Sequence, residues 1–150
     1  MWNLEPNERL REWKQFRERI NNLDFDQSLA ETVHLWSYAP YVNKYLDRFD
    51  HSKWPDPWQL LYDNAYCDLA KALGMLYTLY LSTHYERSFS ELEIRVYKNH
   101  GNGDIFNIVW IDQGKYILNF TFDTIVNKNL IDENLIQLCS HSIQTLKRHF

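Results

Sequence analysis

The 150-residue chain has few of the residues that mark special classes of protein. It contains four glycines, four prolines and two cysteines. Such low numbers exclude a collagen-like chain, a low-complexity chain and a small disulfide scaffold. Neither sign of charge dominates, because 16 basic and 20 acidic residues give a formal net charge of −4. This charge gives no electrostatic reason to expect binding to nucleic acid or to an anionic membrane surface.

Long hydrophobic runs are also missing. The longest apolar stretch, 69–81, is interrupted by Lys71 and is too short for a bilayer span of about 20 residues. The polar N-terminus lacks the apolar segment of a signal peptide. The two cysteines, Cys67 and Cys139, form no CxxC pair. We therefore expect a reduced, cytoplasmic protein without a membrane anchor.

Aromatic side chains are abundant, with six Trp, ten Tyr and eight Phe. The chain length is close to the common size of a domain and predicts a single domain, residues 1–150. Such a domain has limited interior for so many rings. Because Trp and Tyr are enriched at interfaces, we expect an aromatic surface that binds a protein partner, in a homo-oligomer or a larger assembly. A surface that stacks against carbohydrate is the alternative.

Hydrophobic periodicity predicts helices in the first half of the chain and at its end. The predicted helices span residues 8–20, about 26–36, 41–49, about 63–81 and 133–148. The helix over 63–81 is apolar on nearly all sides, which indicates a central position. Between the third and fourth helices, two prolines in 50–58 predict a rigid loop without regular structure.

Strand signals take over after the central helix. Alternating apolar residues and turn signals predict a small antiparallel sheet within about 91–122, with a further short strand over 124–126. Helices, then an antiparallel sheet, then a closing helix define the α+β class. The central helix is expected to begin near Cys67 and to pack on the sheet.

One segment carries residues suited to chemistry. The sequence Trp54-Pro55-Asp56-Pro57 leads into a helix start that reads Cys67-Asp68-Leu69-Ala70. Unpaired N–H groups and the helix dipole favour a thiolate at such a position. Attack by the thiolate on an acyl carbon also needs a histidine to move the proton, and a third group to orient that histidine.

The pattern Trp-x-x-Pro followed by Cys-Asp-x-Ala resembles the bacterial transglutaminase-like cysteine proteinases, over roughly residues 54–120. In that family the catalytic Cys opens the central helix, the His lies on a following strand and the Asp on the next strand. By strand order, the resemblance places Cys67 at the Cys, Asn107 at the His and Asn119 at the Asp. It therefore implies a transglutaminase-like core whose triad is degenerate.

The two asparagines direct the functional interpretation. Asn has no titratable proton and is no general base, so we interpret the chain as a non-catalytic structural or protein-binding module. The same stretch, together with residues 36–40 and 114–119, also faintly resembles uncharacterised tailed-bacteriophage proteins, which implies a virion or assembly component. The alternative is a cysteine-dependent hydrolase or acyltransferase with Cys67 as nucleophile and a base such as His84 or His100 recruited from elsewhere.

No cofactor or metal site is predicted. The six histidines form no HxxxH or HExxH pair, and the Gly101-Asn102-Gly103 turn opens no helix that would hold a phosphate. Asp47, Asp50 and Asp56 could hold Ca²⁺, but a solvated acidic rim is the preferred interpretation. The basic residues of 9–19 are offset by glutamates on the same predicted helix, which favours ion pairing over binding to nucleic acid.

Overall fold

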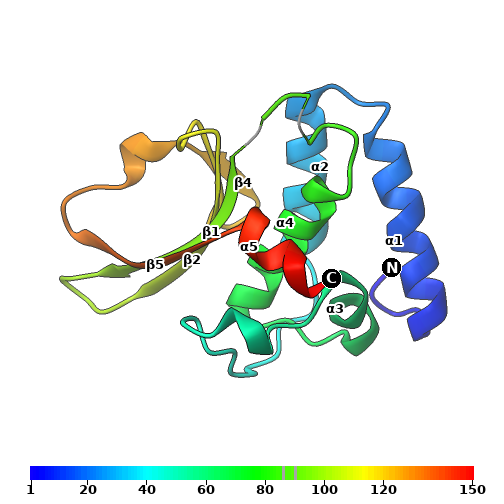
Figure 1. The fold of residues 1–150 in the computed structure, drawn as a ribbon, viewed down its shortest axis with the longest axis horizontal. Helices are drawn as coiled ribbons and strands as arrows, with labels where there is room; N and C mark the ends of the chain where they lie inside the picture. The colour runs from blue at the N-terminus through cyan, green and yellow to red at the C-terminus, as the bar shows by residue number, and fades with distance from the viewer. Residues whose placement is uncertain (86, 90) are drawn as a thin grey trace.

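The computed structural model describes residues 1–85, 87–89 and 91–150. Its helices and strands, in chain order, are α1 (Pro6–Ile20), α2 (Phe25–Ser37), α3 (Pro57–Asp63), α4 (Asp68–Tyr80), β1 (Leu92–Asn99), β2 (Ile105–Ile111), β3 (Tyr116–Thr121), β4 (Thr124–Val126), β5 (Leu135–Ser142) and α5 (Ile143–Leu146). The predicted α+β class is confirmed (Figure 1). Among the described residues, no helix has the length and apolar character needed to cross a membrane.

The helices and the sheet form successive layers. The antiparallel strands lie in the order β4-β3-β2-β1-β5. Helix α4 packs on β1, β2 and β3 with one side and against α2 with another. Helix α1 lies farther from the sheet and packs against α3 (Figure 1). Nearly every residue of α4 is buried, which confirms the predicted central position of this helix.

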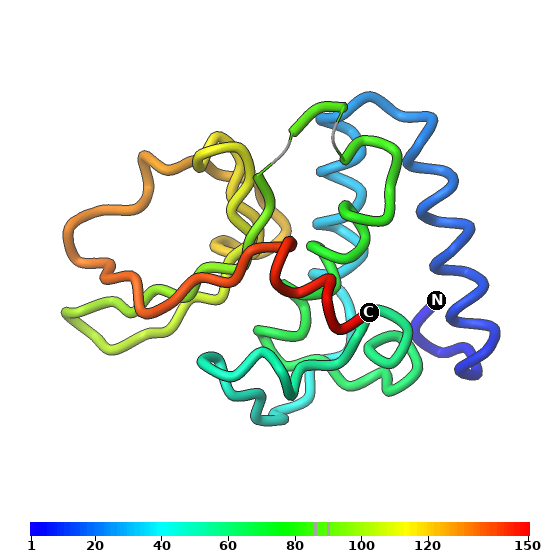
Figure 2. The backbone as a smooth tube through the Cα atoms, viewed as in Figure 1, coloured from blue at the N-terminus to red at the C-terminus, as the bar shows by residue number. Residues whose placement is uncertain are grey.

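The outer face of the sheet has a small core of its own. Residues 127–134 connect β4, at one edge of the sheet, to β5, at the other edge (Figure 2). Ile131 of this connection packs against a cluster that includes Tyr97, Ile108, Trp110 and Ile117. Both faces of the sheet are therefore covered over part of their area, although only one face carries helices.

A buried threonine joins the three longest helices. The Thr78 hydroxyl on α4 accepts hydrogen bonds from the indole N–H of Trp13 at 3.0 Å and of Trp36 at 2.9 Å. It donates to the Gly74 carbonyl at 2.7 Å. One hydroxyl offers one donor and two acceptor sites, so every hydrogen-bonding site of Thr78 is used. Trp36 also lies directly over Gly74, where an added Cβ would come within 2.4 Å of the indole ring.

The last third of the chain departs from the prediction. Residues 133–148 were expected to form one helix, but β5 occupies half of this range, and the closing helix is confined to α5 and a 3-10 turn over Lys147–His149. Strand β5 pairs with β1 from Glu93↔Ser142 to Asn99↔Leu135. The helical spacing of the leucines in 135–146 favours a helix. Pairing of this segment with the edge of β1 outweighs that local preference. The short strand β4 confirms the strand predicted over 124–126.

The region before α4 also differs from the prediction. No helix forms over 41–49; this segment is irregular, with a turn at 48–49, and Tyr41 makes a parallel bridge to Tyr66. Residues 41–45 are exposed, so a helix there would bury no apolar face. The segment 50–58 is not free of helix, because Asp56 caps α3 and Pro57 occupies its first turn, where proline is favourable. Asn64, at a φ of 51°, separates α3 from α4 within the predicted helix 63–81.

Candidate functional site

The cysteine singled out by the sequence sits at the start of α4. Cys67 is the N-cap residue, is half-buried and makes no side-chain hydrogen bond to the first-turn amides. It lines a pocket of about 190 Å³. The remaining lining residues come from the segment 41–48, the start of α4 and β2, and are Tyr41, Asn43, Lys44, Tyr45, Leu46, Arg48, Asp68, Leu69 and Asn107. The fold therefore brings Cys67 and Asn107 into one pocket.

Both asparagines bind the residue that follows the cysteine. The Asn107 Nδ2 on β2 donates to Asp68 Oδ2 at 2.8 Å. The Asn119 Nδ2 on β3 lies 3.3 Å from Asp68 Oδ1 and donates to the Asn107 carbonyl at 2.8 Å. Neither amide has a hydrogen bond to the Cys67 sulfur among the interactions of the described residues. The two amides thus tie the start of α4 to two strands of the sheet through Asp68.

The backbone of β3 helps to place Asn119. This residue has a φ of 66°, a left-handed conformation that Asn tolerates better than most residues. The β3–β4 pairing shifts register between Ile117 and Thr121, on either side of it. Such an irregularity re-aims a side chain relative to a regular strand, and Asn119 accordingly reaches Asp68. The role of Asp68 as the shared acceptor carried no signal in the sequence pattern.

The amide pair leaves one polar atom without a partner. Asn107 is 8% exposed, and its Oδ1 is buried without a hydrogen-bond donor. The amide orientation follows from the contact with Asp68, because only the nitrogen can donate to a carboxylate. The Asn107 side chain cannot take a proton from a thiol at neutral pH, and no histidine is among the described residues that line the pocket. The position at which the resemblance expects a base therefore holds none.

The histidines considered as substitute bases lie elsewhere. His84 follows the far end of α4, and its Nε2 lies 3.0 Å from Ser28 Oγ and 3.1 Å from the Ile20 carbonyl. Helix α4 has 13 residues and is therefore roughly 20 Å long. His100 is exposed in the β1–β2 connection. Val96, which pairs with Asn107, lies four residues before it, or roughly 13 Å along an extended chain. Neither imidazole is within reach of Cys67.

A third histidine contacts the segment that borders the pocket. The Nε2–H of His141 on β5 donates to the Arg48 carbonyl at 2.8 Å, and the Cys139 thiol lies 3.4 Å from the same oxygen. Burial lowers the pKa of His141 and raises the pKa of the Cys139 thiol. These contacts hold the segment 41–48 against the sheet edge. They do not make Cys139 an activated nucleophile, since a raised pKa leaves less thiolate.

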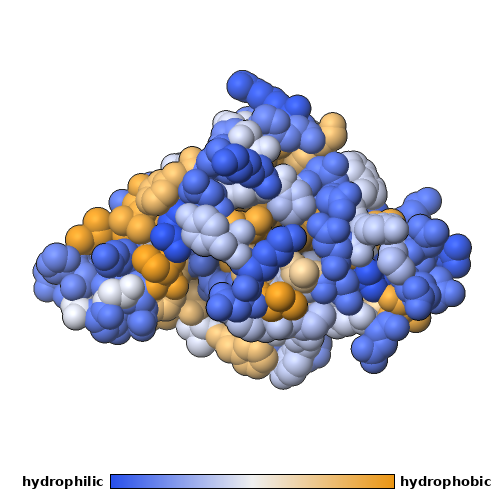
Figure 3. Space-filling view, turned by 90° about the horizontal axis from the view of Figure 1, so that it is seen from below, coloured by the Kyte–Doolittle hydropathy of each residue, from blue (hydrophilic) through white to orange (hydrophobic). Residues whose placement is uncertain are grey.

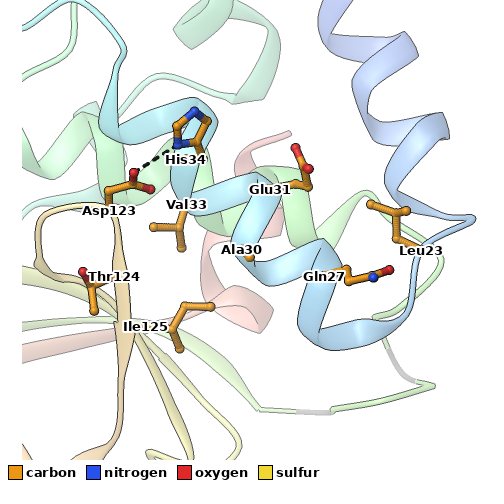
Figure 4. Close-up of a pocket in the computed structure, with 9 residues that line it drawn as sticks. All are labelled: Leu23, Gln27, Ala30, Glu31, Val33, His34, Asp123, Thr124 and Ile125. Carbon is orange, nitrogen blue, oxygen red and sulfur yellow. Dashed lines mark hydrogen bonds and ion pairs between the residues drawn. The ribbon is translucent and has the colours of Figure 1, made fainter.

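A larger pocket lies between α2 and the β3–β4 turn. It has a volume of about 660 Å³, and Val33 and Ile125 face its interior (Figure 4). His34 Nδ1 lies 3.0 Å from Asp123 Oδ2, and Glu31 pairs with Arg19 at 3.9 Å. The ionisable side chains that line this pocket thus each have a partner. The sequence carries no signal for this pocket, because residues from α2 and from β4 meet here only through the tertiary fold.

Several exposed aromatic side chains belong to the part of the chain between α2 and α4. Among them, Tyr41 and Tyr45 border the pocket beside Cys67 and are 63% and 77% exposed. The other strongly exposed rings of this region are Tyr38, Phe49, Trp58 and Tyr62. From below, hydrophobic patches are small and lie among hydrophilic side chains (Figure 3). Within the described part of the chain, no three His, Cys, Asp or Glu side chains are placed to hold a metal ion.

A comparison with solved structures supports a transglutaminase-like fold for this chain. One matched structure is that of calcium-bound LapG from Legionella pneumophila, a transglutaminase-like cysteine protease. The two superpose with a TM-score of 0.72 over 94% of this chain and 78% of LapG, at 12% sequence identity. No protein-family model matches the chain, and no curated protein matches it in sequence.

Proposed function

We propose that this protein is a non-catalytic protein-binding module built on a transglutaminase-like fold. The observation that carries the proposal is the Asn107 side chain, which shares the pocket with Cys67 and is bound to Asp68. Acyl transfer by a cysteine requires a base within hydrogen-bond reach of the thiol. The pocket supplies an amide at that place, and the exposed rings of Tyr41 and Tyr45 at its border suit a protein contact.

The alternative is a cysteine-dependent hydrolase or acyltransferase. Its support is the position of Cys67, half-buried at the N-terminus of a 13-residue helix and facing a pocket. The likeness to LapG, a cysteine protease, points the same way. Activity would then require Cys67 to react without a neighbouring imidazole. We rank this function second for that reason.

The rate of Cys67 alkylation separates the two functions. A Cys139→Ser background leaves Cys67 as the only thiol, and iodoacetamide is compared on this protein and on N-acetylcysteine at pH 6 and pH 8. We expect Cys67 to react no faster than the free thiol. An Asn107→His variant serves as the matched control, since an imidazole beside the thiol should accelerate alkylation. Alkylation at pH 6 more than tenfold faster than that of N-acetylcysteine would establish an activated thiolate and overturn the proposal.

The setting of the module is a separate part of the proposal. The faint resemblance to tailed-bacteriophage proteins supports a virion or assembly component. Mass spectrometry of purified phage particles from a host that encodes the chain tests this setting. Its absence from particles and from their assembly intermediates would refute the phage role and leave the binding module itself untouched.

A further inference from the structure

Three histidine rings form a cluster where residues 147–150 pack against the loop before α3. The centroid of the His51 ring, in that loop, lies 5.4 Å from that of His141 on β5 and 5.2 Å from that of His149. Trp54 packs edge-on against His141, with ring centroids 4.7 Å apart. Histidine is the side chain whose ordinary pKa lies closest to neutral pH. The tertiary fold therefore gathers three groups that can gain a positive charge in mildly acidic solution.

The charged groups around the cluster tolerate one proton better than two. Asp50 precedes His51, and its pKa is lowered, chiefly by the hydrogen bond from Ser52 and in smaller part by the charge of His51. The other charged groups in the segments packed there are mostly cations: Asp47, Arg48, Lys53, Asp56, Lys147 and Arg148. Burial raises the pKa of the neighbouring Cys139 thiol and of Tyr77, so both stay neutral in acid. Further protons therefore add charge to a site with an excess of positive charge.

Burial around His51 and His141 also favours neutral rings. The Nδ1 atom of His51 is buried and has no hydrogen-bond partner. A protonated imidazole carries an N–H on both nitrogens, so charging His51 would bury a donor without an acceptor. His141 is 9% exposed, and its burial lowers its pKa despite the hydrogen bond to the Arg48 carbonyl. The arrangement of the three rings is therefore most stable when the cluster is not fully protonated.

Residues 147–150 are held in place by aromatic contacts. His149 contacts His51. The ring of Phe150 packs edge-on against three rings of α3 and α4, at centroid distances of 5.1, 5.7 and 6.4 Å: Tyr77, Tyr80 and Trp58. Among the interactions of the described residues, no hydrogen bond or ion pair joins 147–150 to a segment other than α5. Phe150 therefore covers part of the surface of these rings, and the segment that places it there has low local stability.

We propose that residues 147–150 are a pH-dependent cover over the rings that Phe150 contacts, bound while the histidine cluster carries at most one proton and released when His51 and His149 are both protonated. Two imidazolium ions with centroids 5.2 Å apart repel each other, and release lets water separate and screen them. The released state binds one proton more than the bound state. Release is therefore favoured up to tenfold for each unit by which the pH falls. This cover is independent of the site at Cys67.

Backbone dynamics measured by NMR test the cover in the full chain. Order parameters of residues 148–150 are measured on ¹⁵N-labelled protein at intervals from pH 7.5 to pH 5.0. We expect values of about 0.85 at pH 7.5, as in rigid backbone, and below about 0.6 at pH 5.0, as in a flexible segment. The nuclear Overhauser effects between the Phe150 and Tyr77 rings should disappear over the same range, whereas the order parameters of α4 should not change.

Matched histidine variants show whether the cluster drives the release. His149→Gln and His51→Gln each remove one of the two charges, so both should keep residues 148–150 ordered at pH 5.0. His149 is exposed, so its replacement should not disturb folding. His100→Gln, at an exposed site outside the cluster, should release the segment as wild type does. The proposal is overturned if wild type stays ordered at pH 5.0, if it is already mobile at pH 7.5, if His149→Gln releases the segment like wild type, or if α4 loses order together with the segment.

Discussion

Two polar clusters at opposite parts of α4 differ in how completely their hydrogen-bonding groups are paired. Thr78 lies in the interior and receives two indole N–H groups while donating to a carbonyl. Asp68 lies exposed at the start of the helix and receives two asparagine amides. The first cluster uses every hydrogen-bonding site of its central residue. The second leaves Asn107 Oδ1 buried without a donor.

The two clusters should therefore contribute differently to stability. A satisfied polar cluster in a low-dielectric interior rigidifies the packing around it. A buried acceptor without a partner lowers stability, and a hydrogen bond donated to that acceptor recovers part of the lost free energy. Asn107 borders the pocket beside Cys67, so the start of α4 is the part of the helix that lies at the candidate site. Substitutions in the Thr78 cluster should therefore lower the free energy of unfolding more than substitutions in the Asp68 cluster.

The largest effect is expected at the Thr78 cluster. Thr78→Val keeps the shape of the side chain but leaves the indole N–H groups of Trp13 and Trp36 buried and unpaired. Each unpaired donor costs about 1–3 kcal/mol, so we expect a loss of about 4 kcal/mol in the free energy of unfolding, measured by urea denaturation. Thr83→Val, at an exposed site, is the control and should change stability by less than about 0.5 kcal/mol. A loss below 1 kcal/mol in Thr78→Val would contradict the role of Thr78.

Packing around the same cluster should be nearly as sensitive. Gly74→Ala places a methyl group within 2.4 Å of the Trp36 ring. Overpacking of this kind costs about 1–3 kcal/mol, and we expect the upper end of that range together with a changed near-ultraviolet circular dichroism signal. Gly101→Ala meets only the Asn99 side chain, at 3.2 Å, and should remain close to wild type. An unchanged tryptophan signal in Gly74→Ala would show that Trp36 is free to move.

The Asp68 cluster should contribute less to stability. Asn119→Gly retains the left-handed backbone and removes the amide that reaches Asp68 and the Asn107 carbonyl. Hydrogen bonds at a part-exposed site contribute about 1 kcal/mol to the free energy of unfolding. We expect Asn119→Gly to lose this amount in urea denaturation. Asn119→Leu should lose more, because a branched aliphatic side chain disfavours a φ of 66°. A loss in Asn119→Gly that equals that of Thr78→Val would abolish the distinction between the two clusters.

The smallest effect concerns pH and the contact beside the pocket. Burial lowers the pKa of His141, and the nearby His51 lowers this pKa to a lesser extent. The hydrogen bond to the Arg48 carbonyl acts in the opposite direction, because it favours the charged imidazole. The unfolded chain therefore binds a proton at this histidine before the folded protein does. We expect the free energy of unfolding to fall as the pH drops below about 6.5, the pKa of an unperturbed histidine. His141→Gln should flatten this pH dependence, whereas His100→Gln, at an exposed site, should not.

Much of this arrangement could be predicted from residues close together in sequence. The apolar spacing in 8–20 and 69–81 predicts α1 and α4, and alternation predicts β1 to β3. The α+β class follows from that order of elements, and the resemblance of residues 54–70 to the transglutaminase-like cysteine proteinases implies the fold. The prediction was wrong for residues 133–148 and 41–49. Their conformations depend on partners distant in sequence, namely the edge of β1 for β5 and Tyr66 for the segment that begins at Tyr41.

For the candidate site, the sequence by itself determined the chemical inventory: a cysteine before a helix, and asparagines where the resemblance expects a histidine and an aspartate. An amide cannot become a base in any fold. Only the tertiary structure decided that both asparagines bind Asp68, that Lys44 and Arg48 border the pocket, and that Asn107 Oδ1 is left unpaired. Hydrogen-bond partners and burial depend on which elements pack together in the tertiary structure. The periodicity of the sequence does not specify those contacts.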